Sequence, residues 1–192
     1  MTQANQENTE LLLWVDCEFT GLSIPEGHKI LEIGAIVTDL SLQEIVEYTS
    51  FIHYDAAVVE DLMCKNPWWD EHARDKPRML AGVKAAPAPN VVDDELAGLV
   101  TNYFGDSKPA LCGNSIHSDK SHIDAELGGL AALLSYQIID VSTIKLVAKK
   151  YLGAEYTNKK HLHYAIDDIR ESVDEMRFLL AKLGITRFSQ IK

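Results

Sequence analysis

The fold of this 192-residue chain begins with a short apolar run, ELLLWVDCEF (residues 10–19). Two more runs rich in β-branched residues follow, KILEIGAIVTDL (residues 29–40) and EIVEYTSFIH (residues 44–53). Runs of this kind, bounded by Gly, Pro, Asp or Ser, predict β-strands. The intervening DLSLQ (residues 39–43) is short enough to join an antiparallel pair. The sequence therefore predicts three early strands, two of them joined by a tight connection.

The remainder of the chain alternates between helical spacing and short strands. Helical spacing runs through DDELAGLVTNYFG (residues 93–105), and the preceding VKAAPAPN (residues 83–90) predicts a loop in which Asn90 or Asp93 is available as a helix cap. Further strands are predicted in PALCGN and YQIIDVST, and further helices in SHIDAELGGLAALL, in TIKLVAKKYL with Ser142 or Thr143 as cap, and in HYAIDDIRESVDEMRFLLAKLG with Gly184 as its stop.

Three strands followed by alternating helices and strands predict an α/β fold. We expect a mixed five-stranded sheet, antiparallel in its first three strands and then parallel, flanked by helices. With 46% hydrophobic residues, residues 11–192 are expected to form a single domain after a solvated tail at residues 1–10.

The chain is acidic, with a formal net charge of -11 and an isoelectric point near 5.0. This negative net charge argues against a protein that binds long nucleic acid, because such binding needs clustered Lys and Arg side chains at the phosphates. Cys17, Cys64 and Cys112 have no paired spacing, which fits a reducing compartment. No secretory signal, transit pattern or membrane-length apolar run is present. We expect a cytoplasmic protein with no membrane partner, or a mitochondrial matrix protein if a leader was removed.

Two carboxylates lie one residue apart within the first predicted strand. Successive strand side chains point to opposite faces, so Asp16 and Glu18 share one face. Two like charges there are costly unless something neutralises them, and Mg²⁺ and Mn²⁺ prefer oxygen ligands. The alternative is that both residues simply face solvent at the end of a strand.

Further acidic candidates follow a predicted strand and open the last predicted helix. Asp119 comes just after PALCGN, where a βα loop commonly carries binding residues, although a helix cap is the simpler role. His163 precedes Asp167 and Asp168, and helical periodicity favours the pair His163 and Asp167 only if His163 lies within the helix. Periodicity leaves the two aspartates undecided, and acidic residues in a first turn also suit the helix dipole.

Five segments in order resemble the oligoribonucleases, which are DEDD-type 3′→5′ exonucleases of the DnaQ class with the histidine variant of the third motif. The segments are WVDCEFTGL, KILEIGAIVTD, CGNSIHSDKSHI, YQIIDVSTIKLV and HYAIDDIRESVDEM. The first and last carry the broad exonuclease pattern, whereas GNSI, DVSTIK and AIDDIRESV are more specific to oligoribonucleases. The resemblance implies a ribonuclease H-like sheet and two divalent cations, Mg²⁺ or Mn²⁺.

The resemblance also assigns roles to the candidate residues. Asp16, Glu18, Asp119 and Asp168 become metal-binding carboxylates and His163 the general base, because the five-residue step from His to Asp selects Asp168 over Asp167. On the same basis, the remaining assignments are Leu22 against the terminal base, Ser115 and Ser142 on the 5′ phosphate, His72 as a wedge, and Tyr136 reaching the opposite subunit of a homodimer.

Two departures from the family pattern affect substrate binding. Gln137 stands where relatives usually have Arg, and a neutral amide cannot supply the charge-assisted fork of a guanidinium to a phosphate. The segment CKNPWWDEHARDKPRML (residues 64–80) matches the family poorly, so Trp68 and Trp69 are open to base stacking, core packing or dimer packing.

The function implied by the resemblance is hydrolysis of short single-stranded RNA to 5′-mononucleotides from the 3′ end. A two-metal mechanism would use His163, which titrates near neutrality, as the base for the attacking water. A substrate of about two to five nucleotides carries few phosphates, so an acidic chain needs no basic groove for it. The alternatives are a DNA-directed exonuclease of the same fold and a nuclease-like module that only binds.

Overall fold

The computed structural model describes residues 10–158 and 164–185, which form a five-stranded mixed sheet with the order β3-β2-β1-β4-β5. β1 pairs antiparallel with β2, and β2 with β3, whereas β1–β4 and β4–β5 are parallel. The predicted fold class is confirmed. The strands are β1 (Leu11–Phe19), β2 (Ile30–Asp39), β3 (Glu44–Phe51), β4 (Leu111–Gly113) and β5 (Ile138–Asp140).

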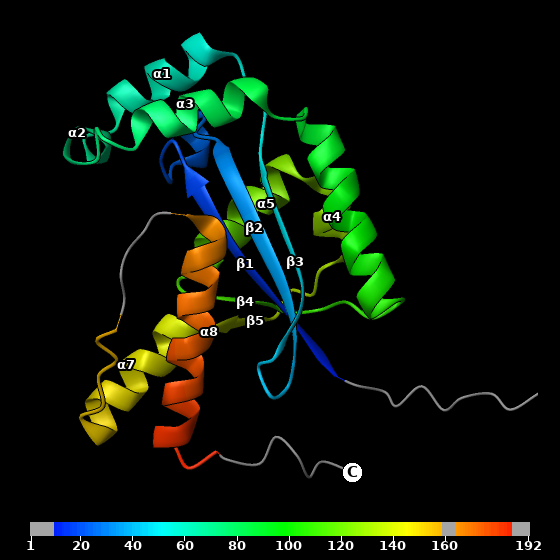
Figure 1. The fold of residues 1–192 in the computed structure, drawn as a ribbon, viewed down its shortest axis with the longest axis vertical. Coiled ribbons are helices and arrows are strands. Elements are labelled where there is room, and N and C mark those ends of the chain that lie inside the picture. Colours follow the sequence, from blue (N-terminus) through cyan, green and yellow to red (C-terminus); the bar gives the residue numbers. More distant parts are fainter. Residues whose placement is uncertain (1–9, 159–163, 186–192) are drawn as a thin grey trace, which may run out of the picture.

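Helices cover both faces of the sheet and one of its ends (Figure 1). α7 and α8 lie on one side of the sheet, α4 lies on the other, and α1–α3 gather beyond the end of β1 and β2. The helices are η1 (Ile24–Glu26), α1 (Ala56–Lys65), α2 (Trp68–Glu71), α3 (Lys76–Ala85), α4 (Pro89–Phe104), α5 (His117–Glu126), α6 (Gly128–Leu133), α7 (Val141–Leu152) and α8 (Ala165–Lys182).

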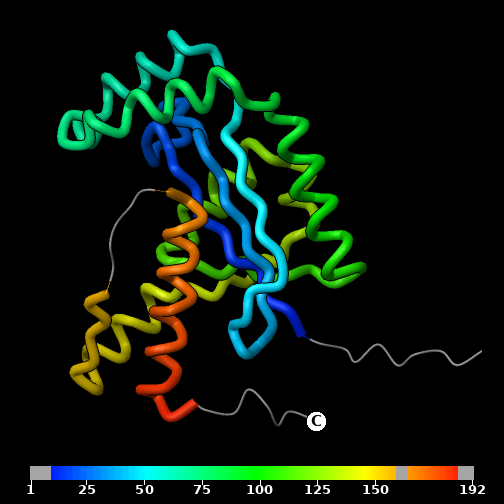
Figure 2. The backbone as a smooth tube through the Cα atoms, in the orientation of Figure 1, coloured from blue at the N-terminus to red at the C-terminus, as the bar shows by residue number. Residues whose placement is uncertain are grey.

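The alternation of side chains along β1 decides which helices each face meets. Leu13, Val15 and Cys17 are buried in the core that includes residues of α4, α5 and α6. Trp14, on the other face, is buried with residues of α7 and α8. Because Asp16 shares the face of Trp14, its side chain is directed toward the side of the sheet that α8 covers. Figure 2 shows α8, in orange, running beside the strands.

A third apolar cluster fixes α1–α3 to the end of the sheet. Its buried members are Leu31, Val59, Met63, Trp69, Met79 and Val83. The loop predicted at residues 83–90 is wrong at both ends, because α3 continues to Ala85 and α4 already begins at Pro89. Proline fits a first helical position, where its missing N–H would have no partner inside the helix.

The predicted caps of two helices are corrected by the structure. α4 starts after Ala88 with no side-chain cap, so neither Asn90 nor Asp93 caps it. The Asp93 carboxylate instead accepts the backbone N–H groups of Gly129 (2.8 Å) and Leu130 (2.7 Å) at the start of α6. α7 begins at Val141, earlier than predicted, because Asp140 accepts the N–H of Ser142 at 2.9 Å.

The helix predicted through residues 121–134 is two helices, α5 and α6, separated at Leu127. Leu127 has non-helical backbone angles (φ -123°, ψ 71°), and the new first turn is held by Asp93. The predicted stop of α8 agrees with Gly184, which has a φ of +75° just past the helix.

Residues 1–9 of the predicted tail lie outside the described residues, and Glu10 is exposed ahead of β1. Among the helices that the structure describes, none combines the length and the apolar character needed to span a membrane.

Candidate active site

Three carboxylates from two distant parts of the chain converge at one end of the sheet. Asp16 and Glu18 come from β1, and Asp168 comes from the first turn of α8. One oxygen of each residue lies within 4.8 Å of the corresponding oxygen of the other two. All three residues are half-buried, so they are reachable while partly withdrawn from water. We refer to Asp16, Glu18 and Asp168 as the acidic triad.

A glycine allows α8 to approach the sheet closely enough to complete the acidic triad. Gly34 of β2 is the register partner of Asp16. A Cβ atom on Gly34 would lie 3.1 Å from the backbone carbonyl carbon of Ala165 and 3.1 Å from Cδ1 of Ile169. The start of α8 therefore rests against bare backbone, which brings Asp168 toward β1.

Electrostatics at the acidic triad favour a cation. Burial raises the pKa of Glu18 to about 8, and the charges of Asp168 and Glu32 add to the effect, while Arg78 opposes it. Carboxylates that repel one another in a partly desolvated site are neutralised by a divalent ion. An all-oxygen donor set fits Mg²⁺ or Mn²⁺ rather than a thiophilic metal.

Asp119 lies beside the acidic triad but outside it. It belongs to the first turn of α5, is 4% exposed, and its Oδ1 accepts the backbone N–H of Cys17 at 2.9 Å. Burial raises its pKa to about 7. Its charge also acts on Glu18. The structure thus brings together three of the four predicted ligands and anchors the fourth on β1 between Asp16 and Glu18.

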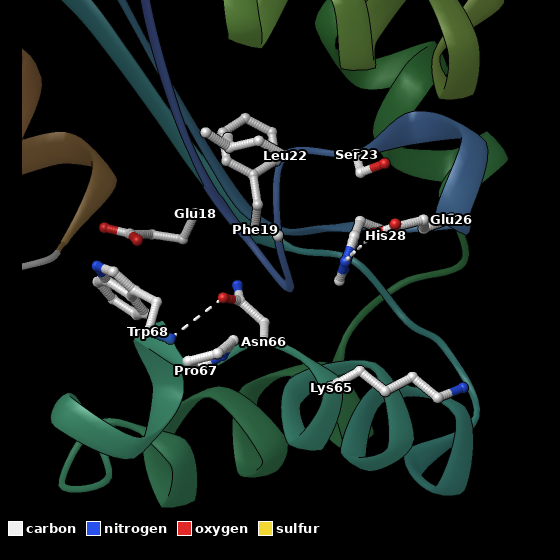
Figure 3. Close-up of a pocket in the computed structure, with 11 residues that line it drawn as sticks. Glu18, Phe19, Leu22, Ser23, Glu26, His28, Lys65, Asn66, Pro67 and Trp68 are labelled. Atoms are coloured by element: carbon white, nitrogen blue, oxygen red, sulfur yellow. Dashed lines mark hydrogen bonds and ion pairs between the residues drawn. The ribbon is translucent and has the colours of Figure 1, made fainter.

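A cavity of about 530 Å³ opens beside Glu18 (Figure 3). Leu22, which is 67% exposed, lies on the β1 side, and Trp68 lies across from it on α2. Asn66 lines the cavity too and accepts the backbone N–H of Trp68 at 3.2 Å. An apolar side chain and an indole that flank a carboxylate offer surfaces for a flat, partly apolar ligand.

Thr20 explains why a Thr-Gly pair follows the two carboxylates in the sequence. Its carbonyl accepts hydrogen bonds from Asn66 Nδ2 (2.9 Å) and Trp69 Nε1 (3.0 Å). Its hydroxyl is 3.0 Å from Nδ1 of His28, and a Cβ on Gly21 would lie 2.6 Å from the His28 ring. The pair therefore joins the end of β1 to the helical wall of the cavity.

The two adjacent tryptophans differ in role. Trp69 is fully buried in the cluster that anchors α1–α3, whereas Trp68 is 37% exposed and lines the cavity. The ring of His72 stacks on Trp68, with centroids 3.7 Å apart and planes 6° from parallel. Of the roles left open for these tryptophans, core packing fits Trp69, and base stacking remains available to Trp68.

Comparisons with known proteins agree with this geometry. The exonuclease family model RNase_T matches residues 13–176. A protein described as oligoribonuclease from Thiobacillus denitrificans is 31% identical over 174 residues, which cover 89% of this chain and 93% of that protein. The chain belongs to the oligoribonuclease family. The predicted nuclease class is confirmed by this membership.

Solved structures of exonucleases share the fold of this chain. Exonuclease I from Methylocaldum szegediense superposes with a TM-score of 0.64 at 14% identity. Exonuclease I from E. coli, in complex with a 5cy-dT13 oligonucleotide, superposes with a TM-score of 0.59 at 13% identity. The chain is covered over 91% and 92% of its length but spans only 41% of each of those longer chains.

The two serines predicted from the oligoribonuclease pattern lie together. Ser115 follows β4 with a φ of +53°, and its hydroxyl is 3.2 Å from that of Ser142 at the start of α7. Asp140 accepts the backbone N–H groups of both, at 3.0 Å for Ser115 and 2.9 Å for Ser142. Neither serine belongs to the set of described residues that lines the cavity.

The remaining predicted residues are not gathered at the acidic triad. Tyr136 is 87% exposed between α6 and β5, and Gln137 beside it is exposed as well. Neither lines the cavity as the described residues define it. His163 lies outside the described residues, one position before Tyr164.

Several residues at the site were not predicted from the sequence. Glu32 is 5% exposed and forms an ion pair with Arg78, whose Nη1 is 2.7 Å from Oε2 of Glu32. A lone acidic residue in the apolar run of β2 was the available signal for Glu32. Arg78, Asn66 and His28 gave no such signal. The contacts of Arg78 and Asn66 depend on how the helical layer packs against the strands, and His28 contacts Thr20 from the segment between β1 and β2.

Proposed function

We propose that this protein is a metal-dependent 3′→5′ exoribonuclease that converts short RNA into 5′-mononucleotides. The observation that carries the proposal is the convergence of the acidic triad beside a cavity, in a chain of the oligoribonuclease family. Hydrolysis of a phosphodiester needs a deprotonated water, charge relief at the phosphate and stabilisation of the departing 3′ oxygen.

The acidic triad would hold two divalent cations, Mg²⁺ or Mn²⁺, with Asp119 as a further ligand. When bound, such ions supply Lewis acidity at the scissile phosphate. Before binding, the three carboxylates concentrate negative charge at one point, which favours a cation and disfavours a bare phosphate. Asp119 holds its carboxylate near β1 through the N–H of Cys17.

His163 would accept the proton of the attacking water. An imidazole titrates near neutrality and can both take up and release a proton at physiological pH. It precedes Tyr164, whose carbonyl accepts the N–H groups of Asp167 (2.9 Å) and Asp168 (3.0 Å) at the start of α8. The five-residue step from His163 to Asp168, which matches the family pattern, supports this role.

Leu22 and Trp68 would hold the bases of a short single-stranded RNA. They flank a cavity of about 530 Å³, which suits a few nucleotides better than a long strand. The formal net charge of -11 supports the same choice, because extended phosphate chains need basic surfaces. Ser115 and Ser142 would donate their hydroxyls to a 5′ phosphate, and Gln137 would add a neutral donor.

We further propose that the protein is a homodimer in which Tyr136 works at the partner's site. The exposed apolar side chains of α7 support a covered face, since Leu146 is 56%, Tyr151 82% and Leu152 53% exposed. Tyr136 is exposed and does not line its own cavity as described. A second copy would bury this apolar surface and receive Tyr136.

The test is a product ladder from end-labelled RNAs of increasing length, from the dinucleotide upward, with Mn²⁺ or Mg²⁺. We expect stepwise release of 5′-mononucleotides from the 3′ end, lost on chelation. Equal or faster cleavage of matched short DNA would instead support a DNA-directed exonuclease. Binding of the oligonucleotides without any cleavage in either metal would refute the proposal in favour of a binding module.

A further inference from the structure

Arg78 of α3 contacts residues of three other segments at the edge of the acidic triad. Its Nη1 donates to Oε2 of Glu32 on β2 at 2.7 Å. Its guanidinium carbon lies 4.2 Å from the centroid of the Tyr164 ring and 5.6 Å from that of Phe51. The side chain is 23% exposed, so these contacts are formed largely away from water.

The first contact ties Arg78 to the strand beside the site. Glu32 is the register partner of Glu18, and its side chain is 7% exposed. A buried carboxylate next to other carboxylates needs a compensating cation, and Arg78 supplies it. The pair fixes the position of the guanidinium relative to β1 and β2.

The second contact ties Arg78 to the start of α8. Tyr164 is the residue before this helix, with extended backbone angles (φ -120°, ψ 119°), and no side chain caps the helix there. Its carbonyl accepts the N–H groups of Asp167 and Asp168. The contact with Arg78 therefore fixes Tyr164. The first turn of α8, which carries Asp168, starts directly after Tyr164.

We propose that Arg78 is a positioning residue for the cation site: paired with Glu32 and stacked on Tyr164, it fixes the first turn of α8 so that Asp168 meets Asp16 and Glu18. This inference rests on the proposed role of the acidic triad in binding divalent cations. It assigns Arg78 no contact with substrate or metal, and it makes α3 a support of the site as well as a wall of the fold.

Charge and position have opposite effects on cation binding, which makes the inference testable. If Arg78 acted through its charge alone, its removal would strengthen binding of a divalent cation, since a nearby repulsive charge would be lost. If it acts by position, its removal weakens binding, because the three carboxylates are no longer held together.

The experiment is calorimetric titration of the full chain with Mn²⁺. We expect Arg78→Met to weaken Mn²⁺ binding by about 10-fold. Tyr164→Leu should weaken it to a similar degree and add little in the Arg78→Met background, because both changes remove one contact. Tyr164→Phe keeps the ring and should bind like wild type. Arg74→Met, at a neighbouring arginine that is 82% exposed, is the matched control and should also bind like wild type.

The Glu32→Gln variant separates the effect of Arg78→Met on stability from its effect on the position of Asp168. Arg78→Met leaves Glu32 buried without this partner and is expected to lower the midpoint of thermal unfolding. Combining it with Glu32→Gln should restore that midpoint, while Mn²⁺ binding stays weaker than in Glu32→Gln alone. The inference would be overturned if the double variant bound Mn²⁺ as tightly as Glu32→Gln alone, or more tightly. It would also be overturned if Tyr164→Leu bound Mn²⁺ like wild type.

The outcomes also separate this inference from the proposed function. If the wild-type protein bound Mn²⁺ but did not hydrolyse RNA, the proposed function would be refuted, and Mn²⁺ binding of the variants could still be compared. If wild type hydrolysed RNA and both Arg78→Met and Tyr164→Leu bound Mn²⁺ like wild type, only the positioning role of Arg78 would be refuted. Absence of Mn²⁺ binding by wild type would overturn both.

Discussion

Two adjacent aspartates at the start of α8 have different surroundings. Asp168 belongs to the acidic triad. The side chain of Asp167 is 42% exposed, and its Oδ1 lies 3.8 Å from Nη1 of Arg170. Helical periodicity left the two residues undecided, and the family pattern selected Asp168. The backbone supplies the reason, because successive helical residues point about 100° apart and only one of them can face β1.

This difference makes Asp167 the matched control for Asp168. Asp168→Asn keeps the shape of the side chain and removes its charge, so we expect hydrolysis of short RNA to fall by about 100-fold or more, together with Mn²⁺ affinity. Asp167→Asn should change either quantity by no more than about twofold. Initial rates and calorimetry on both variants provide the check, and equal losses in the two would contradict the assignment.

The raised pKa of Glu18 predicts a pH dependence of stability in the metal-free protein. The folded protein keeps a proton on Glu18 up to about pH 8, whereas the unfolded chain loses it near the ordinary value of 4.5. Unfolding therefore releases a proton within this window, and the free energy of unfolding falls as pH rises through it. Asp119, with a pKa of about 7, contributes with the same sign.

Glu18→Gln should flatten this slope in urea unfolding at a series of pH values between about 4.5 and 8. Asp94→Asn, at an exposed residue of α4, is the control and should leave the slope as in wild type. Saturating Mg²⁺ should also flatten it, because a bound cation favours the ionised carboxylates. A slope that is the same in Glu18→Gln and wild type would show that another group titrates in this window.

Sequence reasoning found the acidic residues of the site but not their supports. Asp16 and Glu18 could be predicted because charged residues inside an apolar strand have few explanations. Asp168 could be predicted because it follows a histidine at the spacing of the family pattern. Arg78 and Asn66 were not visible, since their contacts join residues more than 40 positions apart. Local patterns do not carry such pairings.

At the scale of elements, the packing of α8 on β2 is the feature that assembles the site. Gly34 sits where the two elements come closest, and the space for a side chain there is filled by Ala165 and Ile169. The strand pattern predicted β2, and the helical pattern predicted α8, but neither pattern stated how closely they approach. The glycine is the residue on which that approach depends.

Gly34→Ala is expected to move the start of α8 away from the sheet. The added Cβ would meet backbone at 3.1 Å, so the contact cannot be relieved by a side-chain rotation alone. We expect a loss of about 1–3 kcal/mol in stability from overpacking and a weaker Mn²⁺ affinity, by about 10-fold. Gly98→Ala in α4, where an added Cβ would meet no atom within 4 Å, is the control. Wild-type Mn²⁺ affinity in Gly34→Ala would contradict this role of the glycine.

Sequence patterns predicted none of the helices of the layer α1–α3. Its helices are short, and α2 spans only Trp68–Glu71. Helices of this length gain little from intrinsic propensity, so tertiary packing on Leu31 and Trp69 decides where they form. The hydrogen bonds that two side chains of this layer donate to the carbonyl of Thr20 show how that packing shapes the cavity.

At the scale of the whole molecule, the proposed homodimer predicts complementation between two inactive variants. If Tyr136 acts on the partner's site, a heterodimer of Tyr136→Ala and Asp16→Ala subunits has one intact site. Half of the dimers formed by equal mixing are heterodimers, so about a quarter of wild-type activity should return.

The control for this experiment mixes Asp16→Ala with Asp168→Asn. Both residues belong to one subunit's site, so each heterodimer site still lacks one carboxylate and no activity should return. Recovery in the control, or none with Tyr136→Ala despite verified subunit exchange, would count against action across an interface. Tyr151→Asp, on the exposed face of α7, should shift the protein toward monomers in sedimentation.

The most direct test of the central claim is anomalous diffraction at the manganese edge from crystals of the protein soaked in Mn²⁺. The account predicts a pair of anomalous peaks at the carboxylates of Asp16, Glu18 and Asp168, and their loss in crystals of Asp168→Asn. Manganese bound only elsewhere on the molecule, with none at these three side chains, would contradict it.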